Sequence, residues 1–250
     1  ERFSANTTIR DLTIVGNHAA AGTSKACCGR EGQHGISVHS STNTLIKRVK
    51  IRRVGGDCFN IANWYDRWQA WSDGVTIRDS VCRLTGRMGA HIAAGTNVRI
   101  VDNVFDDIGY SVIGIEPNNG QQGARDIVVK DNTIGSYSLT DNYLGNLFYA
   151  LNAPWGGGAS VQDVTITGNT VEGNRNGYDG AMLGINVRVE GDVSPRNYTV
   201  TNNTANKAVT GPVIRFTDVN GATVTGNSQP LGSGELARFY GSSSNVTYDG

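Results

Sequence analysis

One short pattern of apolar and polar positions recurs along the whole chain. Each copy begins with an isoleucine or valine and has a mostly apolar residue five positions later. The first positions are Ile9, Ile46, Ile77, Ile100, Val129, Ile166, Val200 and Val224, with spacings of 37, 31, 23, 29, 37, 34 and 24 residues. A minimum of 23 residues with variable additions is typical of a solenoid, whose coils share a circumference and accept insertions at their corners. The pattern therefore predicts a protein built from stacked coils.

Two positions of the pattern predict what lies inside the coils. Five residues after the first position stand Ile14, Ile51, Cys82, Phe105, Ile134, Val171 and Ala205, which we expect to stack in the core. Three residues after it stand Asn103, Asn132, Asn169, Asn203 and Asn227 in the later copies, but Leu12, Val49 and Ser80 in the first three. Buried amides need hydrogen-bonding partners, and a stack supplies them coil after coil. We therefore expect an asparagine ladder in the later coils only.

These columns predict an all-β fold, namely a right-handed, single-stranded parallel β-helix of about eight or nine coils. Residues 1–250 are expected to form a single β-helix domain. The first residues enter a coil at once, whereas the first rung of a solenoid is normally capped. We therefore expect an excerpt of a longer protein that lacks its N-terminal cap. The alternative is a β-sandwich or propeller in which the NT and GN pairs are chance turns.

A second set of strands, one per coil, lies between the copies of the pattern. We expect their inward column to hold Val38, Ile61, Ile92, Ile115, Ile185, Phe216 and Phe239. Because side chains alternate along a strand, the flanking residues then point outward. One outward column would hold Ser37, Asn60, His91, Gly114, Gly184, Arg215 and Arg238, and the next would include His39, Glu116 and Asn186. Neighbouring coils lie about 4.8 Å apart, so His39, Asn60, His91 and Glu116 would share one patch.

This patch is the best candidate for chemistry in the chain. Histidine exchanges protons near neutral pH, and a carboxylate one coil away can orient it or act as an acid or base itself. We expect His91 or His39 to be the base and Glu116 to be its partner or the acid. The alternative is that these are ordinary exposed polar residues, which any solenoid surface carries.

Aromatic residues gather in two insertions between strands. The first holds Trp64, Tyr65, Trp68 and Trp71, and the second ends near Trp155. Flat aromatic faces beside hydrogen-bonding groups suit sugar rings, so both insertions could wall a groove along the second set of strands. The same aromatics could instead pack the insertions onto the body or form a subunit contact.

Composition and charge narrow the functional classes. Lys and Arg together number 22, as do Asp and Glu, so no net field attracts nucleic acid or an anionic membrane. No apolar run approaches the roughly 18–20 residues that a membrane span needs, so membrane insertion is not expected. Asp106 and Asp107 could contribute to a Ca²⁺ site, although aspartate is also a default turn residue. Ca²⁺ is the one cofactor that the residues suggest, and we assign no metal ligands.

The four cysteines leave the cellular compartment open. Cys82 falls in the inward column, Cys58 lies in a strand, and the adjacent pair Cys27 and Cys28 lies in a loop. Nothing matches a zinc-binding spacing. We consider a disulfide between the loop and a strand.

The repeats, the asparagine column and the phrases RRVGGDCFNI, TNVRIVDNVFDDI and GIEPN resemble the pectate-lyase-like (pectin-lyase-like) superfamily of right-handed parallel β-helices. The chain resembles in particular the bacterial and phage "right-handed β-helix region" proteins, and the resemblance covers nearly the whole chain. That superfamily includes polysaccharide lyases, glycoside hydrolases, alginate C5-epimerases and phage tailspike depolymerases. Its members place the active groove on the outer face of a parallel sheet, which implies a groove over the patch described above. The Tyr-Gly-x-Asp-Pro-His phrase of mannuronan epimerases meets only YSVIGIEPN, from Tyr110 to Asn118, which makes epimerisation the less favoured activity.

We therefore expect a carbohydrate-active β-helix that binds and degrades a polysaccharide, as a lyase, depolymerase or glycoside hydrolase. In β-elimination a base removes the proton α to a carboxyl group, and a cation or hydrogen-bond donor stabilises the enolate. We expect Arg87 to clamp the carboxylate of the substrate. The expected substrate-binding residues are Asn60, Trp64, Tyr65, Trp68, Trp71, Tyr110, Asn118 and Trp155.

The rival hypothesis is a non-catalytic structural or receptor-binding module, such as a phage tail or tailspike component. Such a module could form a homotrimer through the aromatic insertions. The lack of a complete catalytic motif favours this rival, whereas the clustered histidines and glutamate favour an enzyme. Both hypotheses imply an extracellular, secreted or virion-associated protein.

Overall fold

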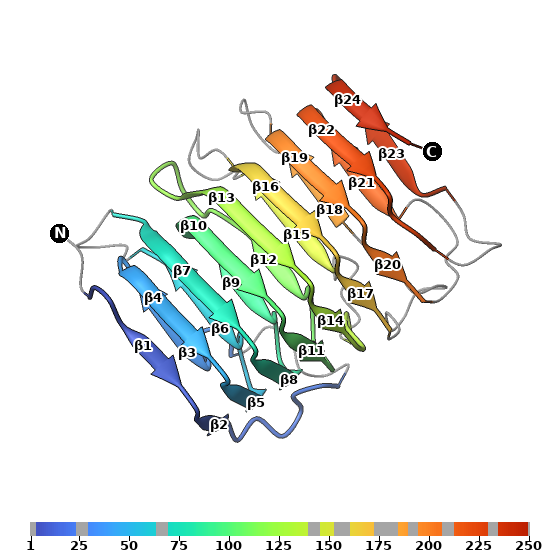
Figure 1. The fold of residues 1–250 in the computed structure, drawn as a ribbon. Coiled ribbons are helices and arrows are strands. Elements are labelled where there is room, and N and C mark those ends of the chain that lie inside the picture. The colour runs from blue at the N-terminus through green and yellow to red at the C-terminus, as the bar shows by residue number, and fades with distance from the viewer. Residues whose placement is uncertain are drawn as a thin grey trace.

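The fold is a solenoid of parallel strands, as Figure 1 shows. The computed structural model describes residues 4–23, 30–63, 70–139, 146–152, 161–172, 185–189, 195–206, 213–229 and 235–249. Their strands form three parallel sheets, and each coil passes from sheet A through sheet B to sheet C. The predicted all-β, right-handed parallel β-helix is confirmed. No helix of the described residues is long and apolar enough to cross a membrane.

The three sheets contain nine, seven and eight strands among the described residues. Sheet A consists of β1 (Thr8–Arg10), β4 (Thr42–Lys47), β7 (Ser72–Arg78), β10 (Ala94–Val101), β13 (Gly123–Lys130), β16 (Val161–Thr167), β19 (Arg196–Thr201), β22 (Asn220–Thr225) and β24 (Ser244–Tyr248). Sheet B consists of β2 (Thr13–Val15), β5 (Lys50–Val54), β8 (Val81–Thr85), β11 (Val104–Asp106), β14 (Thr133–Ile134), β17 (Thr170–Val171) and β20 (Thr204–Ala205). Sheet C consists of β3 (Ile36–His39), β6 (Phe59–Ala62), β9 (Ala90–Ile92), β12 (Ile113–Ile115), β15 (Phe148–Asn152), β18 (Ile185–Val189), β21 (Ile214–Thr217) and β23 (Ala237–Tyr240).

The recurring sequence pattern spans the corner between sheets A and B. Its first position lies in sheet A, where the strand register joins all eight residues from Ile9 to Val224 in one column. The apolar position five residues later lies in sheet B, where Ile51, Cys82 and Phe105 are in register and buried. Both columns point into the core, as predicted.

A left-handed turn separates the two strands in every copy. The turn residues are Asp11, Arg48, Asp79, Asp102, Asp131, Gly168, Asn202 and Gly226, with φ between 51° and 67°. Aspartate, asparagine and glycine tolerate this conformation best, which explains why the pattern carries them just before the ladder position. Arg48 is the exception, and its guanidinium donates two hydrogen bonds to the carboxylate of Asp11.

The asparagine ladder is confirmed and extends further than predicted. The side-chain amide of Asn103 donates to Oδ1 of Asn132 at 3.1 Å, and the next three steps, to Asn169, Asn203 and Asn227, each measure 2.9 Å. Ser80 continues the ladder by one coil, because its backbone N–H donates to Oδ1 of Asn103 and its Oγ accepts from the N–H of Val49. A hydroxyl can replace the amide at the end of the stack, where one fewer partner must be satisfied.

The cysteines pair differently from the loop-to-strand disulfide that we considered. Cys58 and Cys82 form a disulfide inside the core, with Cα atoms 6.0 Å apart. Both side chains point inward from successive coils, which brings their Cα atoms within the range that a disulfide requires. The loop-to-strand pairing is therefore wrong, and Cys27 and Cys28 lie outside the described residues.

The register of sheet C corrects one detail of the predicted columns. Val187, not Ile185, pairs with Ala150 and Phe216 in the inward column. The outward column that contains Asn60 and His91 therefore continues through Asn186 and not through Gly184. A shift of two residues keeps the same side chains on the same face, so alternation alone could not detect it.

Candidate functional site

The outer face of sheet C brings together polar side chains from consecutive coils. Asn60 on β6 is in register with His91 on β9, which is in register with Gly114 on β12. A Cβ atom at Gly114 would lie 2.3 Å from Sδ of Met88, so the glycine leaves room for the buried Met88 side chain. Gly114 therefore interrupts the run of polar side chains after His91.

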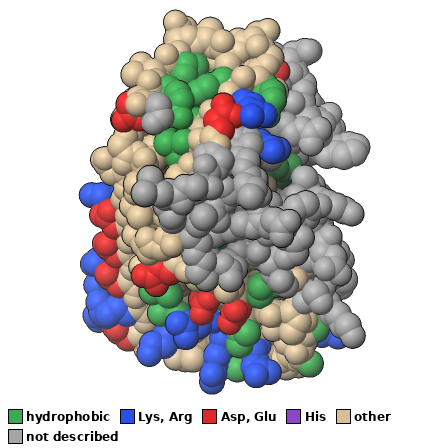
Figure 2. Space-filling view, turned by 90° about the vertical axis from the view of Figure 1, so that its right-hand side faces the viewer, with side chains coloured by type: hydrophobic (Ala, Val, Ile, Leu, Met, Phe, Trp, Pro, Cys, Tyr) green, Lys and Arg blue, Asp and Glu red, His purple; other side chains and the backbone are tan. Residues whose placement is uncertain are grey.

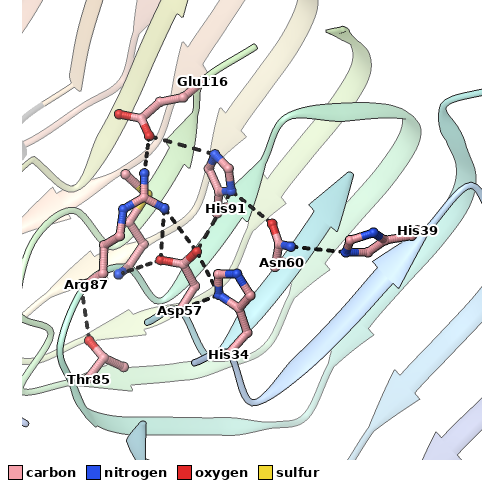
Figure 3. A network of polar contacts seen from close by, with 9 residues as sticks. His34, His39, Asp57, Asn60, Thr85, Arg87, His91 and Glu116 are labelled. Atoms are coloured by element: carbon pink, nitrogen blue, oxygen red, sulfur yellow. Dashed lines mark hydrogen bonds and ion pairs between the residues drawn. The ribbon is translucent and has the colours of Figure 1, made fainter. Parts of the chain in front are cut away.

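Asp57 lies at the centre of an ionic network beneath this column (Figure 3). It is fully buried, and its carboxylate accepts hydrogen bonds from Arg87 at 3.0 and 3.3 Å and from the backbone N–H of Met88 at 3.0 Å. Nδ1 of His34 lies 3.2 Å from Oδ2 of Asp57. Burial alone would raise the pKa of Asp57, but the contacts with His34 and the positive charge of Arg87 lower it. Asp57 is therefore a buried, negatively charged anchor.

Arg87 joins two carboxylates from different coils. Its Nη1 contacts Asp57, and its Nη2 donates to Oε2 of Glu116, just beyond the end of β12. Burial opposes the charged guanidinium, but the two carboxylates outweigh it and raise the pKa of Arg87. The backbone carbonyl of Arg87 accepts hydrogen bonds from Thr85 and from the N–H of Tyr110, which holds the residue in place.

Glu116 has an unusual environment for a carboxylate. Its side chain is 18% exposed. Burial raises the pKa of Glu116, and the negative charge of Asp57 adds to this, while Arg87 opposes the shift. Glu116 therefore retains its proton to a higher pH than an exposed glutamate does, as a general acid requires.

His91 faces Glu116 with one ring nitrogen and Asn60 with the other. Its Nδ1 lies 2.9 Å from Oδ1 of Asn60, and an amide oxygen can only accept, so Nδ1 carries the hydrogen. Its buried Nε2 makes no hydrogen bond and lies 3.7 Å from Oε2 of Glu116. Burial lowers the pKa of His91 to about 4, with Arg87 and His34 adding to the shift and Asp57 opposing it. At neutral pH the ring is therefore neutral, and its basic lone pair is directed toward Glu116.

Asn60 extends this arrangement toward the N-terminal coils. Its side-chain NH₂ group lies 3.3 Å from Nε2 of His39 and donates to it. Burial, together with the nearby His34, lowers the pKa of His39. A cavity of about 640 Å³ opens beside these residues, lined by His34, Ser37, His39, Asn60, Ser41 and Thr44.

The segment that follows Glu116 is tied to the rest of the fold by polar contacts. The indole Nε1 of Trp71 donates to the carbonyl of Gln121 at 2.7 Å. Buried Gln122 donates to Oδ1 of Asn63 at 2.7 Å and accepts from the backbone N–H of Asn118 at the same distance. Trp71 and Gln122 thus fix the segment that carries Glu116 and the exposed Asn118.

The structure brings together most of the residues that the sequence singled out. His39, Asn60, Arg87, His91 and Glu116 form one connected network. Tyr110 is buried and supports Arg87 through its backbone, while Trp71 and Asn118 lie on or beside the segment after β12. Trp64, Tyr65, Trp68 and Trp155 lie outside the described residues.

Sequence reasoning did not single out Asp57 or His34. The signal for Asp57 was the strand register, because Asp57 precedes Asn60 by three residues as Met88 precedes His91. Continuing the pairing of β6 with β9 by three residues toward the N-terminus would have placed Asp57 beside Arg87 and Met88.

The acidic residues near β11 are engaged with the chain itself. Oδ1 of Asp106 accepts from the N–H of Ser136 at 3.0 Å, and Oδ2 lies 3.6 Å from Nε of Arg83. Across the described residues, no group of three or more His, Cys, Asp and Glu side chains is arranged to hold a metal ion. The Ca²⁺ site at Asp106 and Asp107 stays a prediction.

Comparisons with known proteins bear on the fold. Neither a protein-family model nor a curated protein sequence matches the chain. Among solved structures, DFA-IIIase from Arthrobacter chlorophenolicus A6, without its lid and in complex with GF2, matches with a TM-score of 0.57 and 14% identity over 86% of this chain and 49% of that one. The surface protein and adhesin PfbA of Streptococcus pneumoniae matches with a TM-score of 0.53 and 14% identity over 97% of this chain and 66% of that one. The chain thus spans about half the length of the DFA-IIIase chain without its lid.

These neighbours include a carbohydrate-active enzyme and an adhesin, and at this level of identity the likeness shows the fold alone. The three parallel sheets of the structure indicate the same β-helix fold without reference to the neighbours. The chain therefore has the right-handed parallel β-helix fold of the pectate-lyase-like proteins that its sequence resembles.

Proposed function

We propose that the chain binds a polysaccharide on the outer face of sheet C and cleaves it by acid–base chemistry, with His91 as the base and Glu116 as the acid. One observation carries the proposal, namely that Nε2 of His91 lies 3.7 Å from Oε2 of Glu116 while their environments shift the two pKa values in opposite directions. A neutral histidine beside a carboxyl group that tends to keep its proton is the division of labour that acid–base cleavage needs.

The pair can perform both halves of a β-elimination. Nε2 of His91 removes the proton α to the carboxyl group of a uronic acid residue, and its electron pair forms the double bond as the glycosidic C–O bond breaks. Glu116 gives its proton to the departing oxygen. In hydrolysis the same pair would act on water and on the leaving oxygen, so the chemistry of the products decides between the two reactions.

The neighbouring residues have supporting roles in this proposal. Asp57 fixes Arg87, and Arg87 fixes Glu116, so both position the acid. The guanidinium has five N–H donors, and those not used by Asp57 and Glu116 can contact a substrate carboxylate, as the sequence predicted for Arg87. The aromatic insertions and the exposed Asn118 remain the predicted sugar-binding groups. The disulfide between Cys58 and Cys82 supports an extracytoplasmic location.

The test is cleavage of a panel of acidic and neutral polysaccharides by the chain and by two variants, His91→Ala and Glu116→Gln. Elimination produces unsaturated ends that absorb ultraviolet light, whereas hydrolysis produces reducing ends without this absorbance. Each variant should lose about 100-fold or more of the rate, because each removes one member of a general acid–base pair. Glu235→Gln is the matched control, since this exposed carboxylate also pairs with an arginine, Arg238, but lies far along the chain. Unchanged cleavage by both active-site variants would refute the proposal.

The second candidate is a non-catalytic binding module, in line with the rival hypothesis from the sequence. The match to the adhesin PfbA, which covers 97% of this chain, favours it. This candidate predicts retention of a polysaccharide or receptor without any product, in wild type and in both active-site variants alike. Light scattering on the intact chain tests the accompanying expectation of a homotrimer.

A further inference from the structure

We propose that the N-terminal part of the outer face of sheet B is a second carbohydrate-binding surface, which takes polyanionic glycans that carry carboxylate or sulfate groups. It is formed by Lys50 and Arg52 on β5 and by Arg83 on β8. This basic surface lies on a different sheet from the His91–Glu116 pair, and its binding does not depend on catalysis there.

The three cations surround a shallow groove. Arg52 and Arg83 are direct partners in the strand register, and Lys50 stands two residues before Arg52 on the same face. The groove has a volume of about 520 Å³, and its lining includes the three cations together with Thr13, Val81 and Val104. Figure 2 shows most of the lysine and arginine side chains of this view in its lower half, where the N-terminal coils lie.

The charge on the basic surface is poorly balanced by the chain itself. Among the described residues Lys50 and Arg52 have no ion-pair partner, and Arg83 has only Asp106, at 3.6 Å. Like charges placed opposite one another on neighbouring strands destabilise a sheet. Such an arrangement costs stability unless an anion is bound, which points to an anionic ligand.

Sheet A provides an informative contrast within the same coils. Its outward column of Arg10, Lys47 and Arg78 is equally basic and equally in register. There, however, Asp11 and Asp79 lie beside the cations, and each pairs with an arginine. The chain thus neutralises one basic column and leaves the other open.

The groove between the cations favours a glycan over a nucleic acid. Val81 and Val104 lie in register with Lys50, and Val15, which lies in register with Arg52, is 54% exposed. Aliphatic side chains can contact the C–H faces of sugar rings, whereas single-stranded nucleic acids are held by stacking on aromatic side chains. The described outward residues of sheet B include no aromatic side chain. From β2 to β11 those that alternate with the core residues include Thr13, Val15, Lys50, Arg52, Val81, Arg83, Val104 and Asp106, and Arg53 is exposed beside them.

The experiment measures binding of the full chain to polygalacturonate, heparin and neutral dextran by affinity electrophoresis and titration calorimetry. All proteins carry Glu116→Gln, so that the probe stays intact whether or not the chain is an enzyme. Removing two cations with Arg52→Gln and Arg83→Gln should raise the Kd for a polyanionic glycan about fivefold or more, because two charge contacts are lost. The matched control carries Lys47→Gln and Arg78→Gln, which remove the same charge from sheet A. A variant with Arg52→Lys and Arg83→Lys keeps the charge and should retain most of the binding.

The outcomes separate cleanly. Binding to polygalacturonate or heparin that is weakened by the sheet B variant alone supports the inference, and the preferred probe tells carboxylate from sulfate. Equal weakening by the sheet A control, or no binding to either glycan, overturns it. Binding only to single-stranded DNA or to anionic phospholipid vesicles, which are run as parallel arms, also overturns it. Absence of any cleavage by the chain without the Glu116→Gln change, together with this binding, would refute the proposed function and leave the basic surface standing.

Discussion

Asn60 holds His91 in a single tautomer. The amide oxygen of Asn60 accepts the Nδ1 hydrogen of His91 at 2.9 Å, and its NH₂ group donates to Nε2 of His39 at 3.3 Å. The three side chains therefore form a directed chain of hydrogen bonds across neighbouring coils. It ends at Nε2 of His91, which is left unprotonated beside Glu116.

Replacing Asn60 by aspartate tests this relationship. A carboxylate next to Nδ1 stabilises the protonated ring, so we expect the pKa of His91 to rise from about 4 by roughly one to two units. The histidine ring signals in a pH titration by NMR measure this directly. If His91 is the base, the acid side of the activity profile moves to higher pH by the same amount. Asn245→Asp adds the same charge at an exposed position of β24, far along the chain, and should shift neither.

The depressed pKa of His91 also makes the stability of the fold depend on pH. The folded pKa is about 4 and the unfolded value is 6.5, so between these values the unfolded chain binds a proton that the folded chain excludes. The free energy of unfolding therefore falls as the pH is lowered through this window, by roughly 3 kcal/mol in total. Glu116, whose pKa is raised in the folded state, acts in the opposite direction at pH values just above the usual pKa of a glutamate.

His91→Gln isolates this contribution, because Glu116 is present in both proteins. Urea unfolding at pH 7 and at pH 4.5 should show a smaller loss of stability in the variant than in the wild type. An identical loss in the two proteins would mean that the pKa of His91 in the folded state is close to its unfolded value.

The sequence predicted the solenoid well because each coil repeats the same physical constraints. The inward aliphatic residue recurs eight times, the left-handed turn eight times and the inward asparagine five times. Repetition turns a weak local signal into a strong one. The threonines that flank the pattern's first position were overlooked. They pair in register and form outward columns such as Thr165, Thr199 and Thr223. Their neighbours in the strand point into the core, so these threonines point away from it.

The candidate site was harder to predict, since its centre lies outside the regular strands. Asp57 precedes β6 and Arg87 precedes β9, so neither falls in an alternating column. Their contact depends on how the corners approach one another, and the insertions that shape those corners do not repeat. The disulfide was missed for a similar reason, because Cys58 lies just before β6 and its inward direction was not evident from alternation.

The disulfide between Cys58 and Cys82 should contribute measurably to stability. It closes a loop with a sequence separation of 24 residues, and the loss of chain entropy in the unfolded state corresponds to about 3 kcal/mol. A variant with Cys58→Ala and Cys82→Ala should therefore have a free energy of unfolding that is lower by this amount, with a further loss from the cavity. The variant then unfolds at a lower denaturant concentration than the wild type. Reduction of the wild type by dithiothreitol under native conditions should be slow, because both sulfur atoms are buried. Equal stability of the variant and the wild type would show that the two thiols are not linked.

The asparagine ladder makes the strongest prediction about the fold. Asn169 accepts two hydrogen bonds from Asn132, and its own NH₂ group donates to the carbonyl of Val129 and to Asn203. Alanine at this position leaves the buried backbone N–H and amide of Asn132 without an acceptor, and each unsatisfied buried group costs about 1–3 kcal/mol. We therefore expect Asn169→Ala to lower the free energy of unfolding by about 3 kcal/mol or more, as measured by denaturant titration. Asn227→Ala is the matched control at the end of the ladder. There the side chain is only partly buried and donates to the carbonyls of Val200 and Thr225 but to no further asparagine, so the substitution should cost less. A cost at Asn169 no larger than at Asn227 would mean that the amides do not act as a continuous stack.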